Sequence, residues 1–185
     1  YPCWSRCTTQ RSIIHFKEIQ NYYETNEWDF SGDIQHDYEE QIGSLNPDLS
    51  KFKYIEKALW EHNDSLNFYK QDNDQYVSQT LVENMFGSKY DVVECVTIEN
   101  IMKQNEHKHI DILKLDIEGA EITVLSHMLD CKIYPKVLCI EFDLILKGKD
   151  VNNHTKQIIN RLQNDGYKVV HNDNMNITFT YTDST

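Results

Sequence analysis

The sequence predicts an α/β fold in which parallel strands alternate with helices. Two stretches, residues 110–116 and 136–143, are nearly continuous apolar runs, as expected of parallel strands that are buried on both faces. Each run is followed by a segment whose apolar residues recur at helical spacing. Strands that alternate with helices in this way form a parallel sheet with right-handed crossovers.

The first fifty residues have a different pattern. Apolar residues from Ile13 to Tyr23 recur at helical spacing, which predicts an amphipathic helix over about residues 8–25. Residues 25–50 are polar and acidic and contain chain-breaking residues, which predicts a loop or a short irregular helix. We therefore expect an atypical N-terminal segment, residues 1–50, and one α/β domain, residues 51–182.

Regular structure is expected from residue 51 onward. The predicted elements, in chain order, are strands at 52–59, 65–69 and 91–97, a short helix after 97, a strand at 110–116, a helix that begins near 118, a strand at 136–143, a helix at 153–165, and strands at 167–170 and around 177–179. Gly166 is placed to end the last helix. A short turn rich in Asn and Asp joins the last two strands, so we expect them to pair antiparallel.

Composition excludes several classes of partner. The chain has 30 acidic and 18 basic residues and a net charge of −12, and such an anionic surface repels the phosphates of nucleic acids. No apolar run approaches the ~18 residues that a membrane span needs. The five cysteines include no Cys-x-x-Cys and no Cys/His pair at zinc spacing, and Cys3 and Cys7 are too isolated to interpret, so no metal site is predicted from them.

Sequons are no evidence of secretion here. Asn-x-Ser/Thr occurs at Asn63, Asn153 and Asn176, about as often as a chain this rich in Asn contains it by chance. The sequence favours the cytoplasm and is compatible with the secretory pathway.

Carboxylates gather at the ends of the two central predicted strands. Lys114 and Asp116 share one face of the first strand, and Glu141 and Asp143 share a face near the end of the second. If these strands are neighbours, Asp116 and Glu141 lie within several ångströms of each other, at the edge where α/β sheets bind ligands. Such a cluster can hold a divalent cation, act as a general base, or bind the hydroxyls or amine of a ligand. The pattern also fits a structural ion pair with Lys114.

Two more acidic residues and a glycine follow Asp116. Glu118 and Glu121 would lie in the first turn of the predicted helix, where the helix dipole favours carboxylates whatever the function. Gly119 in a first turn would cost up to ~1 kcal/mol relative to alanine, which suggests that backbone or a ligand passes close by. Close local packing explains the glycine equally well.

These residues resemble a known family. The run Ile110-Asp-Ile-Leu-Lys-Leu-Asp-Ile-Glu-Gly-Ala-Glu resembles the Lys-x-Asp-x-Glu-Gly-x-Glu block of FkbM-like methyltransferases, and Val137-Leu-Cys-Ile-Glu-Phe resembles the strand that follows it. Residues 93–102 are similar to the strand and helix that lead into the block, and residues 54–59 to the family's third strand. The similarity spans residues 51–181.

The resemblance implies a class I methyltransferase, with a Rossmann-like sheet whose last strand is reversed. It implies transfer of a methyl group from S-adenosylmethionine to a hydroxyl, on a small molecule or a glycan. Carried over by position, the implied catalytic residues are Lys114, Asp116 and Glu141. The implied cofactor-binding residues are Ala58, Leu59, Asp116, Glu118, Gly119 and Glu121, the first two beside the adenine ring.

The sequence departs from the family at the cofactor loop. The fold binds its cofactor with a glycine-rich turn after its first strand, but this chain has six glycines and no Gly-x-Gly. No apolar strand of the expected kind precedes residue 51. Two interpretations follow: the sheet is incomplete at its N-terminal strands, or the protein is a non-catalytic member without a cofactor site. A sheet without those strands would leave the strand at 110–116 with an unpaired edge.

Overall fold

The computed structural model describes residues 53–72, 78–146, 148, 150 and 153–182. Described residues from Lys57 onward belong to one compact unit. The helix predicted over residues 8–25 and the loop predicted over 25–50 lie outside the described residues, as does the boundary at residue 50.

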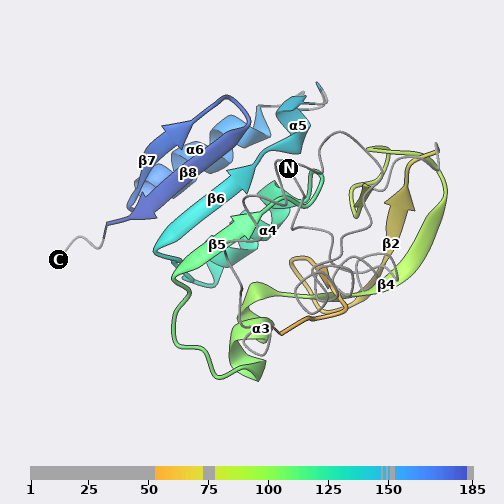
Figure 1. The fold of residues 1–185 in the computed structure, drawn as a ribbon, viewed down its shortest axis with the longest axis horizontal. Helices are drawn as coiled ribbons and strands as arrows, with labels where there is room; N and C mark the ends of the chain where they lie inside the picture. Colours follow the sequence, from red (N-terminus) through yellow and green to blue (C-terminus); the bar gives the residue numbers. More distant parts are fainter. Residues whose placement is uncertain (1–52, 73–77, 147, 149, 151–152, 183–185) are drawn as a thin grey trace, which may run out of the picture. The chain divides into compact units, whose positions relative to one another are not determined.

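The first described elements are strands, and from residue 90 to residue 172 helices lie between successive strands (Figure 1). They are β1 (Ala58–Leu59), β2 (Ser65–Lys70), β3 (Gln79–Thr80), β4 (Tyr90–Val96), α3 (Ile98–Gln104), β5 (Ile112–Leu115), α4 (Glu121–Asp130), β6 (Val137–Glu141), α5 (Asp143–Leu146), α6 (His154–Asn164), β7 (Tyr167–Asn172) and β8 (Asn176–Tyr181).

The strand predicted at 52–59 is much shorter than expected. Of its described residues, only Ala58 and Leu59 pair, in parallel with Cys95 and Val96 at the end of β4. These are the buried residues of β4, whereas the earlier part of that strand is mostly exposed and pairs with β2 instead. The observed strand is therefore limited to the two residues that lie beside the buried end of β4.

The strands form two mixed sheets. The first has the order β1-β4-β2-β3, in which β2 is antiparallel to both β3 and β4. The second has the order β5-β6-β8-β7, in which β5 and β6 are parallel and β8 is antiparallel to both neighbours. The antiparallel pairing expected for the last two strands is confirmed. Among the described strands, β5 lies at the edge of its sheet.

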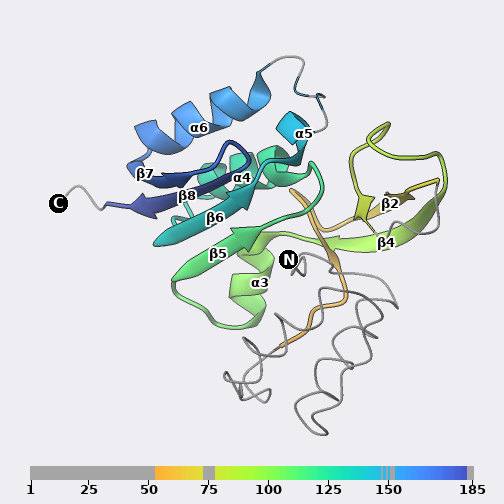
Figure 2. The same ribbon diagram turned by 45° about the horizontal axis from the view of Figure 1, so that its top comes forward.

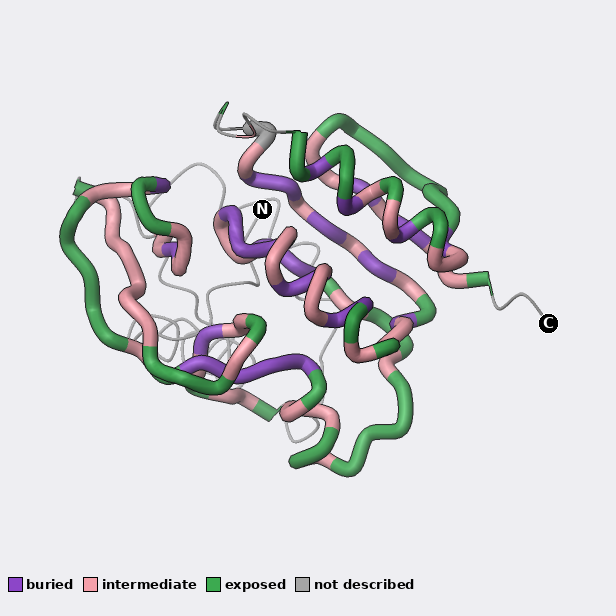
Figure 3. The backbone as a smooth tube through the Cα atoms, turned by 180° about the vertical axis from the view of Figure 1, so that it is seen from behind, coloured by how far each residue is buried: buried purple, intermediate pink, exposed green. Residues whose placement is uncertain are grey.

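Helices α4 and α6 cover one face of the second sheet (Figure 2). Seen from behind, both helices lie over the sheet and show a buried stripe (Figure 3). The core between these helices and the sheet contains residues that are each exposed by 1% or less: Leu115, Leu125, Met128, Leu138, Ile140, Phe142, Leu162 and Phe179.

The parallel strands are buried on one face only, which corrects the prediction for β5. Leu115 is 1% exposed, but Ile112, on the opposite face, is 67% exposed. The reason is tertiary: α4 and α6 both lie on the same side, and no described helix covers the other side of β5. Lys114 shares that open face with Ile112.

Two helix ends agree with the local sequence. Thr97 caps α3 because its side chain accepts a hydrogen bond from the Asn100 N–H at 3.0 Å. Gly166 follows α6 with φ +106°, the backbone conformation for which glycine was predicted there. Among the described residues, no helix combines the length and the apolarity that crossing a bilayer requires.

Candidate active site at the carboxyl ends of β5 and β6

Lys114 of β5 lies between two carboxylates. Its Nζ is 3.8 Å from Asp116 Oδ2 and 3.6 Å from Glu141 Oε2. The strand register brings the two carboxylates together, because Leu115 pairs with Ile140 and the next residue along each strand is acidic. The expected neighbouring of these two strand ends is confirmed. We call Lys114, Asp116 and Glu141 the rim.

The rim carries more negative than positive charge. The side chain of Asp116 is 9% exposed, that of Glu141 27% and that of Lys114 40%. Burial raises the pKa of the Glu141 carboxyl, the negative charges of Asp116 and Glu118 raise it further, and Lys114 opposes them. A half-buried carboxylate with a raised pKa is suited to accept a proton.

The backbone makes a left-handed turn directly after Asp116. Glu118 has φ +56° and Gly119 has φ +101°, so neither residue can belong to an α-helix. The helix begins at Glu121, with Ala120 at the cap position, rather than near Glu118. The dipole argument therefore does not apply to Glu118.

Glu121 is fully buried beneath this turn. Its Oε1 accepts hydrogen bonds from the N–H of Ile117 at 2.9 Å and of Gly119 at 3.1 Å. Burial and the nearby negative charge of Asp143 raise its pKa to about 7, although the backbone hydrogen bonds lower it in part. Asp143 itself is 5% exposed and begins the short helix α5, where a loop was expected.

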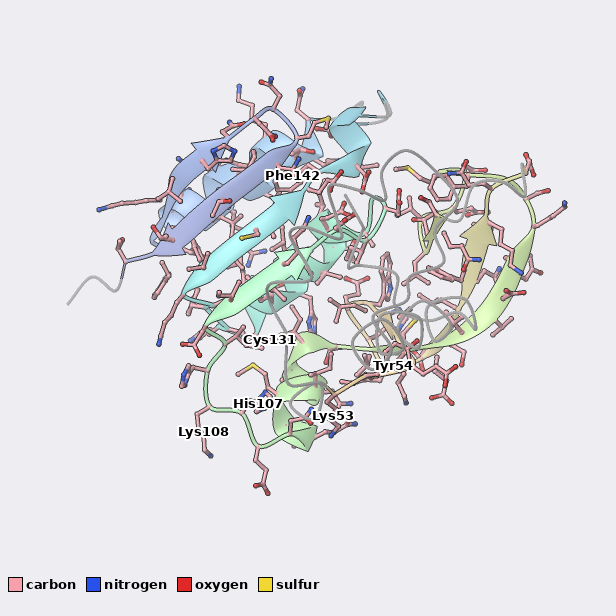
Figure 4. All side chains as sticks on the ribbon, viewed as in Figure 1. Lys53, Tyr54, His107, Lys108, Cys131 and Phe142 are labelled. Atoms are coloured by element: carbon pink, nitrogen blue, oxygen red, sulfur yellow. The ribbon has the colours of Figure 1, made fainter. Side chains whose placement is uncertain are left out.

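Phe142 follows Glu141 at the same end of the sheet (Figure 4). It is fully buried, and its N–H donates to the Met175 carbonyl at 3.0 Å. Adjacent residues of a strand point to opposite faces, so burial of Phe142 in the core turns Glu141 toward the open face. Among the described residues, no group of three or more His, Cys, Asp or Glu side chains is arranged to hold a metal ion.

The family model for the Methyltransferase FkbM domain matches residues 22–169. The chain belongs to the FkbM methyltransferase family. The match includes both strands that carry the rim, and it begins within the segment that the sequence pattern separated from the α/β domain. No curated protein and no solved structure matches the chain significantly.

A second segment of the chain also contacts this turn. Thr80 of β3 is fully buried, and its hydroxyl donates to the Glu118 carbonyl at 2.7 Å while accepting from the Val82 N–H at 3.0 Å. Met85 packs against Gly119. Sequence reasoning missed Thr80 and Met85, because neither stands out in the local pattern and their partners lie more than thirty residues away.

The two residues implied to lie beside the adenine belong to the other sheet. Ala58 is 4% exposed and Leu59 packs against the core, both in β1. The remaining implied residues, Lys114, Asp116, Glu118, Gly119, Glu121 and Glu141, are gathered around the turn after β5.

The Met85 side chain packs closely against Gly119, which fits the explanation of this glycine by local packing. A Cβ at Gly119 would lie 2.9 Å from Met85 Cε, and the backbone there has positive φ. We expect Gly119→Ala to lower the free energy of unfolding by about 2 kcal/mol, through backbone strain and crowding together. Denaturant titration measures this.

Gly148 provides the matched control. It also has positive φ, +61°, but a Cβ added there would have no other atom within 4 Å. Gly148→Ala should cost about 1 kcal/mol, from backbone strain alone. Equal losses in the two variants would show that the contact with Met85 contributes nothing.

Proposed function

We propose that this methyltransferase uses S-adenosylmethionine and transfers the methyl group to a hydroxyl of a small molecule or glycan, with the rim as its catalytic centre. The observation that carries the proposal is the placement of Asp116 and Glu141 within 4 Å of one ammonium group, at the carboxyl ends of adjacent parallel strands. The strand order β5-β6-β8-β7, with β8 reversed, supports a class I sheet whose N-terminal strands are not among the described residues.

The chemistry of the rim fits this reaction. When bound, S-adenosylmethionine supplies an electrophilic methyl group, and a hydroxyl that receives it must lose its proton. Glu141, partly exposed and with a raised pKa, is the acceptor for that proton. Asp116 orients the acceptor hydroxyl, and Lys114 holds the two carboxylates together and limits their repulsion.

The residues around the turn also fit the cofactor. Its amino group, ribose hydroxyls and sulfonium charge all favour carboxylate oxygens, which Asp116 and Glu118 offer at a strongly acidic site. Ala58 and Leu59 would form an apolar contact for the adenine ring by family position. The proposed reaction is inferred from the family and from the rim, so an assay of methyl transfer tests it directly.

That test is the transfer of labelled methyl groups from millimolar S-adenosylmethionine to a panel of sugars, oligosaccharides, small alcohols and phenols. We expect product with at least one hydroxyl acceptor. Absence of transfer to every member, by a folded chain, would contradict the proposal and favour the non-catalytic interpretation.

Cofactor affinity should be low. No Gly-x-Gly is present to let the backbone approach the carboxypropyl group, so we expect a dissociation constant above about 100 μM, or roughly −5.5 kcal/mol or weaker. Isothermal titration calorimetry with S-adenosylmethionine measures it. Low-micromolar affinity would show that another loop of this chain replaces the glycine-rich turn.

A further inference from the structure

Glu121 is the acidic residue of the family block that lies deepest in the protein. Its side chain has no exposed surface, whereas the carboxylates of Asp116 and Glu141 remain partly open to solvent. A residue enclosed in this way cannot touch an acceptor hydroxyl at the rim. Its contribution must therefore act through the residues that it contacts.

The contacts of Glu121 are with the turn. One oxygen, Oε1, receives the N–H groups of both Ile117 and Gly119, the residues on either side of Glu118. These donors point toward Oε1 because the positive φ values of Glu118 and Gly119 reverse the chain there. Without this acceptor, two backbone donors would be left unsatisfied inside the protein, at about 1–3 kcal/mol each.

The second oxygen, Oε2, is buried and has no hydrogen-bond partner among the described residues. Because Oε1 is already occupied by two donors, Oε2 is the position that carries the proton when Glu121 is neutral. The nearby negative charge of Asp143, at the start of α5, favours the neutral form of the Glu121 carboxyl. Holding the turn therefore requires the reach of the side chain and an acceptor oxygen, and does not require the negative charge.

The turn is also held on its other side, where the Thr80 hydroxyl binds the Glu118 carbonyl and Met85 packs on Gly119. Asp116 immediately precedes the held segment, and Glu118 lies within it. Displacement of the turn would move both carboxylates with respect to Lys114 and Glu141.

We propose that Glu121 is a positioning residue for methyl transfer, whose Oε1 holds the amides of Ile117 and Gly119 and thereby sets Asp116 and Glu118 at the rim. This inference rests on the proposed function for its catalytic part and on the hydrogen bonds alone for its structural part.

Two substitutions separate the effect of the length of the Glu121 side chain from the effect of its negative charge. Glu121→Gln keeps the length of the side chain and an acceptor oxygen but is neutral, whereas Glu121→Asp keeps the charge but is one methylene shorter. We expect amide hydrogen exchange at Ile117 and Gly119 to become about tenfold faster in Glu121→Asp than in Glu121→Gln. We expect methyl transfer at saturating acceptor to be at least tenfold slower in Glu121→Asp than in Glu121→Gln.

The inference is overturned if Glu121→Asp matches the wild type in amide exchange and methyl transfer. It is also overturned if Glu121→Gln loses as much methyl transfer as Glu121→Asp, because the negative charge would then be the property that transfer requires. If Glu121→Asp does not fold, Glu121→Gln alone decides. Protected amides at Ile117 and Gly119 together with retained methyl transfer in Glu121→Gln support the inference, and loss of the protection or of the transfer overturns it. If the wild type transfers no methyl group to any acceptor, the proposed function fails, while the exchange comparison still decides whether Glu121 holds the turn.

Discussion

Replacing Asp116 by Asn is expected to slow methyl transfer by about 100-fold or more and to leave the melting temperature unchanged or slightly higher. Asn cannot supply the negative charge that orients the acceptor hydroxyl beside Glu141. Stability should survive because Lys114 is 40% exposed and keeps Glu141 at 3.6 Å, so no buried ammonium loses its only partner. The substitution also removes a negative charge that raises the pKa of Glu141.

Melting and turnover are measured on the same preparations. Glu141→Gln should show the same separation, with transfer reduced and the fold retained. Asp111→Asn is the matched control, because Asp111 lies just before β5, is 65% exposed, and pairs with Lys136 away from the rim. It should leave transfer unchanged. If Asp116→Asn instead costs a few kcal/mol of stability with a proportionate loss of activity, the rim is a structural ion pair and not a catalytic centre.

The second large effect is a fall in stability as the pH rises from about 5 to 8. The pKa of Glu121 is about 7 in the folded protein and 4.5 ordinarily, so the folded state binds this proton more tightly than the unfolded state does. The stabilisation from this group is complete below the ordinary value and is lost as the pH rises through the folded value. The difference corresponds to a loss of about 3 kcal/mol.

Chemical denaturation at a series of pH values measures this loss. Glu121→Gln should remove most of the slope, since an amide does not titrate, and it should be more stable than the wild type at pH 8. The raised pKa of Glu141 adds a smaller slope of the same sign that the variant retains. Glu99→Gln, an exposed position in the first turn of α3, should keep the full slope. A wild-type stability that is flat between pH 5 and 8 would mean that Glu121 is not buried as described.

Local pattern and one topological rule sufficed to predict the rim. Asp116 and Glu141 each follow an apolar strand, and the carboxyl ends of consecutive parallel strands lie side by side. The same reasoning predicted the boundaries of α6 and the antiparallel last pair, because helical spacing, Gly166 and the Asn/Asp turn are all encoded within a few residues.

Other features depend on residues that are distant in the sequence. The helix was expected near Glu118 because acidic residues suit a first helical turn, but the hydrogen bonds from Ile117 and Gly119 to Glu121 favour a left-handed turn instead. A continuous strand was predicted at 52–59 from its local pattern of apolar residues. Of its described residues, only the last two pair with β4.

The family, the order of the main strands and helices, and the carboxylates that meet at the rim were all predictable from the sequence. All of these follow from short-range periodicity, chain-breaking residues and a recognisable block. Three features depend on the tertiary structure instead: no described helix covers one face of β5, Thr80 hydrogen-bonds to the turn from thirty-eight residues away, and Glu121 is fully buried. Burial and hydrogen bonding depend on which side of a sheet its helices cover, and residue spacing along the chain does not specify that side.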